Sequence, residues 1–308
     1  MEKTRARVVE WRWMLLPVVL CAFAIQIGGT TVSAQAGWFP PFMPIPGVGR
    51  FPDFIPMSGV TPRGVAVDSF GNVFVSVGRG SGSNERVLVW KFAPGGEQLL
   101  EVDIGQGTIG GLLVDDCGDL YVALAAGTDR GVYRVDRVGQ KELLPGTNQI
   151  FFANGLAFDD WGTLYITESV SMTQSGPGPG GIWRIPRWGH AELCVRHELL
   201  SGTGALGQPV PIGANGIAYY LGNLYVTNTE KGTVLRIPAW PRLRVGLPRL
   251  WTTLKEVPEA LEPLKLKFPV VMGDGIVVDA YGNLYVAVLT RSAIVRVNIW
   301  NKTHLLES

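Results

Sequence analysis

Five copies of one short pattern recur along the chain, and this repeat restricts the possible folds more than any other feature. Each copy has an apolar segment after a glycine, a tight turn at a second glycine, and another apolar segment containing Phe or Tyr. The copies are GVAVDSFGNVFVSV from Gly64, GLLVDDCGDLYVAL from Gly111, GLAFDDWGTLYITE from Gly155, GIAYYLGNLYVTN from Gly216 and GIVVDAYGNLYVAV from Gly275. We interpret each copy as two short strands joined by a tight turn.

Two further apolar segments follow each pair of strands. The third segments are VLVWKF, GVYRVD, GIWRIPR, TVLRIPAW and AIVRVNIW, and the fourth ones are EQLLEV, KELLPG, AELCVRHELL, RLWTTL and HLLES. Four short antiparallel strands in a repeat of about 45 residues are typical of a propeller blade. The sequence therefore predicts an all-β protein, a β-propeller with five recognisable blades. The first segment of each blade is apolar on both faces, which predicts that it lies innermost.

The composition supports this fold class. The 308 residues include 40 Gly and 21 Pro, and the only candidate helix, 255–268, contains two prolines. The net charge of +1 gives no indication of a nucleic-acid partner.

Positions that recur in every blade are predicted to be structural. Short carboxylates stand before the turn glycine and are expected to accept backbone N–H bonds there, namely Asp68, Asp115, Asp159 and Asp279. Basic residues recur in the third strands and are expected to make cross-strand or solvent contacts, namely Lys91, Arg134, Arg184, Arg236 and Arg296.

The position before the first-strand glycine does not repeat. It is occupied in chain order by Arg63, Gly110, Asn154, Asn215 and Asp274. First strands line the channel of a propeller, so these residues are predicted to form one ring at a mouth of the channel. Two amide oxygens and a carboxylate suit Ca²⁺ or a similar hard cation, which predicts a metal site. The alternative is that each Asn or Asp only caps a loop.

The ends of the second strands are predicted to face the same mouth. They carry Glu168 and Asn228, where the other blades have Val77, Ala125 and Val288. Glu168 is a candidate metal ligand, a candidate general base, or an ordinary exposed acid; Asn228, Arg63 and Gly110 are expected to line the pocket. The segments SVSMTQSGPGPGG, 169–181, and SGTGALGQPVPIG, 201–213, are predicted to be rim loops, the first a flexible rim or lid.

The strand starts ANG, ANG and GDG, followed by LYIT and LYVT in the first two, resemble the senescence-marker-protein/gluconolactonase superfamily of six-bladed propellers. Paraoxonases and strictosidine-synthase-like proteins are its relatives, and the resemblance covers roughly Val60 to the C-terminus. The GNLYV segments also resemble non-catalytic NHL repeats, which are the second choice.

This resemblance implies a divalent metal, usually calcium, that activates a lactone or ester for hydrolysis at the top of the axis. It maps the metal onto Asn154, Asn215 and Asp274. In a metal-dependent hydrolase, Asp274 or Glu168 is expected to be the catalytic residue that takes the proton of the bound water. The superfamily has a Glu where this chain has Arg63, a cation that would weaken metal binding. Three outcomes stay open: Glu168 compensates, Arg63 turns away, or the metal is lost. Five blades in place of six imply an open or distorted ring, or a chain that lacks its last blade.

The N-terminal residues, 1–36, are predicted to be a secretory signal. Basic residues precede the run MLLPVVLCAFAIQIGG, and AQA at 34–36 offers a cleavage point. No stable membrane span is expected after its removal. A Pro-rich lead-in, 37–57, then precedes a propeller domain over 58–308. In an exported protein Cys117 and Cys194 are allowed but not required to form a disulfide.

Two functions are compatible with these observations. The first is an exported, secreted or periplasmic, metal-dependent hydrolase that acts as a monomer on a small-molecule lactone or ester. The second is a secreted, non-catalytic propeller that binds a protein or a glycan through its rim loops. The fold alone does not choose between them.

Overall fold

The computed structural model describes residues 59–80, 85–208, 210–240, 244–254, 272–289 and 293–300, and the backbone of 304–307. The predicted signal, the Pro-rich lead-in 37–57 and the candidate helix 255–268 lie outside the described residues. Across the described segments no helix has the length and hydropathy needed to cross a membrane.

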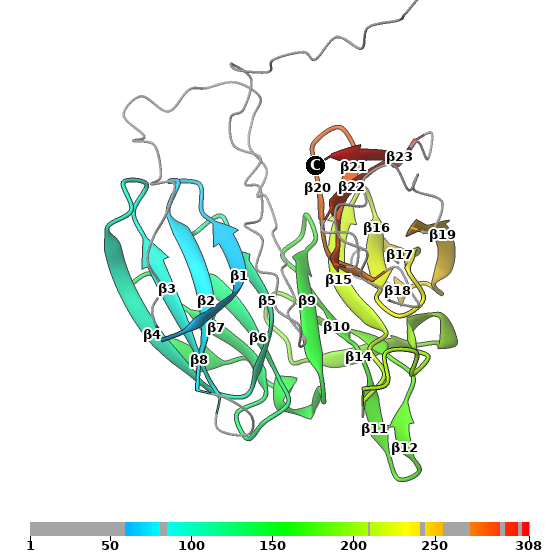
Figure 1. Cartoon of the computed structure of the whole chain (residues 1–308), viewed down its shortest axis with the longest axis horizontal. Helices are drawn as coiled ribbons and strands as arrows, with labels where there is room; N and C mark the ends of the chain where they lie inside the picture. Colours follow the sequence, from blue (N-terminus) through cyan, green and yellow to red (C-terminus); the bar gives the residue numbers. More distant parts are fainter. Residues whose placement is uncertain are drawn as a thin grey trace, which may run out of the picture.

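Five antiparallel sheets follow one another along the chain and surround a common axis as the blades of a β-propeller (Figure 1). Blade 1 contains β1 (Thr61–Val67), β2 (Val73–Arg79), β3 (Arg86–Phe92) and β4 (Gln98–Gln106). Blade 2 contains β5 (Thr108–Val114), β6 (Leu120–Ala125), β7 (Gly131–Val135) and β8 (Lys141–Leu143). Blade 3 contains β9 (Ala153–Phe158), β10 (Leu164–Glu168), β13 (Gly181–Ile185) and β14 (Glu192–Arg196).

Blade 4 contains β15 (Ala214–Tyr220), β16 (Asn223–Asn228), β17 (Thr233–Trp240), β18 (Arg244–Val245) and β19 (Arg249–Thr253). Blade 5 contains β20 (Gly273–Val278), β21 (Asn283–Val288), β22 (Ala293–Asn298) and β23 (His304–Glu307). The helical elements of the described residues are two 3₁₀ turns, η2 (Thr147–Gln149) and η3 (Glu198–Leu200). The predicted all-β propeller is confirmed, and four of its blades have the predicted four strands; blade 4 has the two-residue strand β18 in addition.

The first strand of every blade is innermost. Along the chain β1 contacts β5, β5 contacts β9, β9 contacts β15, and β15 contacts β20. The apolar character of these strands on both faces follows from this position, because each lies between two neighbouring blades; β9 and β15 are buried over most of their length.

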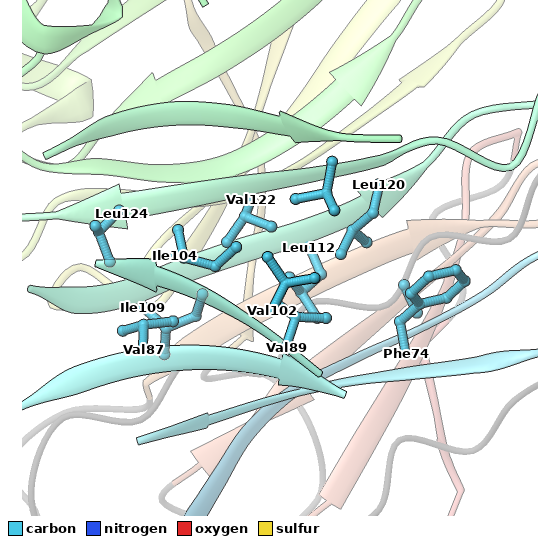
Figure 2. Close-up of a cluster of buried hydrophobic side chains, with 12 residues drawn as sticks. Phe74, Val87, Val89, Val102, Ile104, Ile109, Leu112, Leu120, Val122 and Leu124 are labelled. Atoms are coloured by element: carbon cyan, nitrogen blue, oxygen red, sulfur yellow. The ribbon is translucent and has the colours of Figure 1, made fainter. Parts of the chain in front are cut away.

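The core lies between the blades. Between blades 1 and 2, Val89 and Ile104 of the first blade lie with Leu112 and Val122 of the second, and all four side chains are almost fully buried (Figure 2). Burying one such side chain stabilises the fold by about 1.5–3 kcal/mol. Similar clusters join the later blades, so each blade depends on its neighbours for a core.

The turns between first and second strands are fixed as predicted. In blade 3 the Oδ1 atom of Asp159 accepts hydrogen bonds from the backbone N–H groups of Trp161, at 2.9 Å, and Thr163, at 2.8 Å. Gly162 supplies the positive φ of 79° that the turn requires. The same pair of bonds recurs at Asp68, Asp115 and Asp279.

The insertion 169–181 is more regular than predicted. It contains a hairpin of β11 (Ser171–Thr173) and β12 (Gly176–Gly178), which lies apart from the blades at the lower right of Figure 1. The Ser171 hydroxyl donates to the carbonyl oxygen of Pro179 across the base of this hairpin at 2.9 Å. Cys117 and Cys194 are both free thiols.

Candidate functional site

The five non-repeating residues occupy equivalent places, which we call the strand-start ring. In every blade the register between the first and second strands shifts at this point. A β-bulge releases its residue from the alternation of the ladder and re-aims the side chain. The residues that sit on these irregularities are Arg63, Gly110, Asn154, Asn215 and Asp274.

Glycines bring neighbouring inner strands into backbone contact at this ring. A Cβ atom on Gly155 would lie 2.5 Å from the carbonyl oxygen of Asn215, and one on Gly216 would lie 2.6 Å from that of Asp274. Only a residue without a side chain fits so close to a neighbouring backbone. Asn154, Asn215 and Asp274 therefore stand side by side on β9, β15 and β20.

The amide of Asn154 has a defined orientation. The hydroxyl of Ser169 donates its single proton to the carbonyl oxygen of Ala214 at 2.6 Å, so it can only accept from Asn154. The Nδ2 group of Asn154 accordingly donates to Ser169 Oγ at 3.0 Å. Its Oδ1 atom is turned away from Ser169, on the other side of the amide, and Asn154 itself is only 2% exposed.

Asn215 repeats this arrangement one blade further on. Its Nδ2 group donates to Thr229 Oγ1 at 2.9 Å, and Thr229 Oγ1 donates to the carbonyl oxygen of Gly273 at 2.9 Å. The bonds link each ring residue to the strand that carries the next one, because Ala214 and Gly273 directly precede Asn215 and Asp274. The two amide oxygens are thus positioned by the packing of three consecutive blades.

A second pair of hydroxyls holds the same strands together. Thr167 Oγ1 accepts from the N–H of Gly155 at 2.7 Å and donates to the carbonyl oxygen of Asn215 at 2.5 Å. Thr227 Oγ1 accepts from Gly216 at 2.9 Å and donates to the carbonyl oxygen of Asp274 at 2.5 Å. These bonds satisfy backbone groups that the bulges release from the ladder.

Asp274 contributes a carboxylate to the ring and is 0% exposed. Blade 5 has Leu289 at the position that Ser169 and Thr229 occupy in the two preceding blades. The hydroxyls of Ser169 and Thr229, each of which accepts from a ring amide and donates to the next blade, form what we call the hydroxyl relay. Leu289 cannot continue this relay, so it ends before Asp274, where an acid replaces the amide.

Arg63 forms an ion pair within its own blade. Its Nη2 atom lies 2.7 Å from Glu85 Oε1, and both side chains are mostly buried. Gly78, which takes the place of Ser169 in this blade, leaves room for the pair, since a Cβ there would lie 2.1 Å from Glu85 Oε1. The positive charge of Arg63 is thus compensated by Glu85, the partner that the sequence did not reveal.

Gly110 is the residue of the strand-start ring that has no side chain. A Cβ atom at this position would lie 2.6 Å from the carbonyl oxygen of Ala153 and 2.9 Å from Cα of Asn154. Blade 2 consequently has no space for a ligating side chain here.

Glu168 is buried, with 1% exposure, and its carboxylate accepts from three donors. Oε1 binds the N–H of Phe151 at 2.9 Å, while Oε2 binds Trp183 Nε1 at 2.8 Å and lies 2.9 Å from Nη2 of Arg196. These contacts tie the end of β10 to β13 and β14. They account for the buried charge, and a catalytic role for Glu168 stays a prediction.

Asn228 occupies the same register in blade 4. Its Nδ2 group donates to the carbonyl oxygens of Leu199, at 2.8 Å, and Ser201, at 2.9 Å, and its Oδ1 accepts from the N–H of Lys231 at 3.1 Å. The side chain therefore holds the segment around η3. In blade 2 the residue at this register is Leu124 and not the expected Ala125, because Ile109 pairs with Leu124.

The loop 201–213 is held by a buried acid that the sequence analysis missed. Glu230 is 2% exposed, and its Oε2 accepts from the N–H groups of Thr203, Gly204 and Ala205. Its Oε1 accepts from the N–H of Ile212 at 2.9 Å. Four backbone donors on one carboxylate give this rim loop a defined shape.

A sequence signal for the hydroxyl relay did exist. The two blades with Asn in the strand-start ring have Thr-Glu-Ser, 167–169, and Thr-Asn-Thr, 227–229, whereas the other blades have SVG, ALA and AVL at these positions. At the third of these positions a hydroxyl, that of Ser169 or Thr229, thus occurs only in the two blades that have an amide in the strand-start ring.

The donor set fits a hard cation. Two amide oxygens and one carboxylate are ligands that Ca²⁺ accepts, with water filling its remaining positions. Within the described residues no cluster of three or more His, Cys, Asp or Glu side chains could hold a metal, so a site here would depend on the asparagines.

Comparison with known proteins places the fold. No protein-family model matches the chain, and no curated protein sequence matches it. A solved luciferin-regenerating enzyme is 15% identical, with a TM-score of 0.55 over 86% of this chain and 78% of that one. A regucalcin from Agrobacterium tumefaciens, described as a calcium-binding protein, is 17% identical, with a TM-score of 0.54 over 90% and 78%.

A chain of a nidogen/laminin complex is also similar, with 15% identity and a TM-score of 0.54 over 80% of this chain and 79% of that one. At such identities the likeness shows the fold. The propeller fold expected from the resemblance to the senescence-marker-protein/gluconolactonase superfamily is confirmed.

Proposed function

We propose that the chain is an exported, calcium-dependent hydrolase of the gluconolactonase-like type, acting on a lactone or ester. The observation that carries the proposal is the row of Asn154, Asn215 and Asp274 on three adjacent inner strands. Both amides are oriented by hydroxyl relays, so their oxygens are fixed before any ligand arrives. In binding sites, the side chains that contact a ligand are commonly held in place by hydrogen bonds to neighbouring residues, as these amides are.

Each residue of this row has a separate role in metal binding or hydrolysis. Asn154 and Asn215 would hold the cation through their Oδ1 atoms, and Asp274 would supply the negative charge. When bound, calcium would act as a Lewis acid toward the carbonyl group of the substrate. Asp274 would accept the proton of the attacking water and return it to the leaving alcohol oxygen as the C–O bond of the ester breaks. Arg63 does not oppose this chemistry because Glu85 compensates its charge at 2.7 Å.

Isothermal titration with calcium tests the site. Asp274→Asn keeps the shape of the side chain and removes its formal charge, so calcium affinity should fall about tenfold or more. Asp160→Asn is the matched control, because it removes a charge from the turn at the other end of β9; its calcium affinity should equal that of the wild type. Equal affinities for wild type and Asp274→Asn would show that the three residues are loop caps.

A lactone and aryl-ester hydrolysis assay on the same variants tests the reaction itself. Wild-type activity should be lost on chelation, return with calcium, and be reduced in Asp274→Asn. Calcium binding without hydrolysis of any lactone or ester would favour the second function.

The second function is a non-catalytic propeller that binds a protein or glycan at its rim. Two ordered rim segments favour it. The hairpin β11–β12 is held by its own ladder, and Thr203 and Ile212 of the loop 201–213 are held by hydrogen bonds to Glu230. Glycan-array and pull-down measurements with the hairpin deleted would distinguish this function, since the deletion should abolish binding and leave calcium affinity intact.

Export and a monomeric state complete the proposal. The support for export is the N-terminal pattern of basic residues, apolar run and AQA. N-terminal sequencing of the protein from its host should give a start near Gln35 or Gly37, and an intact Met1 on a cytoplasmic species would contradict export.

A further inference from the structure

Blade 1 has an apolar face that no other described blade covers. In blade 2 the corresponding side chains Val122 and Leu124 are 0% exposed, because blade 1 packs against them (Figure 2). The repeat places Val75 and Val77 at these positions of blade 1. They are buried as well, at 9% and 0% exposure, although no described strand precedes β1. Something must therefore take the place that a preceding blade takes elsewhere.

We call this surface the outer face of blade 1. Side chains directly opposite in neighbouring strands lie on the same face of a sheet, and Trp90 is opposite Val75 while Leu88 is opposite Val77. The buried cluster on this face consists of Val75, Val77, Leu88, Trp90 and Phe92. An apolar sheet face of this kind is stable only when another element packs on it.

Blade 5 does not provide this cover within the described residues. Its buried cluster joins it to blade 4, as where Val286 lies with Leu254, and includes no side chain of blade 1. On the opposite face of blade 5, Tyr285, Ala287 and Ile294 stay partly exposed. The cover of the outer face is thus to be sought outside the part of the chain that the structure describes.

The chain enters blade 1 along this face. Val60 directly precedes β1 and packs against the cluster of the outer face. The Pro-rich lead-in, 37–57, comes just before it in the sequence. As an extended polyproline segment it would span roughly 60 Å, whereas a seven-residue strand such as β2 is about 23 Å long. The lead-in is therefore long enough to cross the whole face.

The lead-in has the composition of a segment that docks without pairing as a strand. Its stretch WFPPFMPIP, 38–46, contains four prolines and no charged residue. Proline has no N–H for a sheet ladder but favours the polyproline conformation, in which the backbone carbonyl groups have no internal partner. Aromatic-lined grooves bind such segments when two prolines are separated by two residues, as Pro41 and Pro44 are.

Trp90 gives the outer face the matching chemistry. Its ring meets that of Phe92 edge to face, with the ring centres 6.3 Å apart, so the two form an aromatic platform. The indole N–H of Trp90 is buried, and no acceptor for it lies among the described residues. Buried indole N–H groups normally have a partner. A free carbonyl group of a polyproline segment would supply that acceptor.

We propose that the Pro-rich lead-in docks on the outer face of blade 1 as a polyproline-type segment, with the stretch 38–46 over Trp90 and Phe92. Apolar burial stabilises the contact, and the hydrogen bond from the Trp90 indole sets its register. The segment takes the place of a preceding blade and shields blade 1 without adding a strand. This inference does not depend on the metal site or on hydrolysis.

Photo-crosslinking on the full chain tests the contact directly. Benzoylphenylalanine in place of Phe42 should give intramolecular cross-links that map to β2 and β3, within 73–92. The same group in place of Trp188, which is 91% exposed in blade 3, is the control and should not link to 73–92. Cross-links from position 42 to a second copy of the chain, or only to other blades, would overturn the proposal.

Urea denaturation followed by circular dichroism measures what the contact contributes. Trp38→Ser/Phe39→Ser should lower the midpoint by about 1 M, because two buried rings are lost. The matched control Phe70→Ser/Trp188→Ser also removes one Phe and one Trp, but both are mostly exposed, so its midpoint should equal that of the wild type. Equal midpoints for the two double variants would contradict docking.

The Trp90 indole reports on the hydrogen bond itself. Its ¹⁵N–H resonance is identified by its absence in Trp90→Phe, which keeps an aromatic ring and removes the donor. The indole proton should exchange slowly with solvent in the wild type and faster in Trp38→Ser/Phe39→Ser. Fast exchange in the wild type, or equal rates in the two proteins, would show that the lead-in does not cover Trp90.

Discussion

A single added methyl group at Gly155 tests how the inner strands are built. In Gly155→Ala the new Cβ would lie 2.5 Å from the carbonyl oxygen of Asn215, 2.9 Å from the N of Ile217 and 3.0 Å from Cα of Gly216. All three atoms belong to the backbone of β15, so no side-chain rotation relieves the overlap. The strands must separate, which breaks the hydrogen bond from Thr167 Oγ1 to the carbonyl oxygen of Asn215 that joins the two blades.

The expected cost is about 1–3 kcal/mol for overpacking a tight core position, with a further contribution of about 1 kcal/mol for each lost hydrogen bond. Urea denaturation followed by fluorescence should show a lower midpoint with an unchanged slope. Calcium affinity should also fall, since the added methyl group pushes Asn154 away from Asn215.

Gly95→Ala is the matched control. No atom lies within 4 Å of a Cβ built on Gly95, and its φ is not positive, so the same change should leave stability equal or slightly higher. If Gly155→Ala unfolds at the same urea concentration as Gly95→Ala, the inner strands do not depend on backbone contact and the reasoning is refuted.

Two further predictions concern buried groups. Glu168→Ala removes the carboxylate that binds Arg196 and the indole N–H of Trp183. Differential scanning calorimetry and urea denaturation should therefore show a free energy of unfolding lower by about 3–5 kcal/mol. An unchanged denaturation midpoint would contradict this network of contacts. Burial raises the pKa of the Cys194 thiol to about 12, against the opposing effect of nearby Arg184, so its reactive thiolate is scarce at pH 8 and grows only as pH approaches 12. Iodoacetamide labelling with peptide mapping at pH 8 should modify exposed Cys117 first, and preferential labelling of Cys194 would refute the assignment.

The sequence alone determined the fold and the place of the candidate site. Strand alternation, glycine turns and the acids that fix them act over a few residues, so the pattern in one blade suffices to define it: Asp159 bonds N–H groups only two and four residues away. Repetition then identified the strand-start ring as the position that differs between blades. Packing of successive inner strands follows from the propeller plan, which is why Asn154 and Asn215 were expected side by side.

The tertiary structure decided what each side chain contacts. Ser169 reaches a carbonyl 45 residues away at Ala214, and the ion pair of Arg63 and Glu85 spans 22 residues. Glu168 was as good a candidate base as Asp274 in the sequence, yet its carboxylate meets an indole and a guanidinium within its own blade. Such partners depend on the distances between strands, and local spacing does not encode those distances.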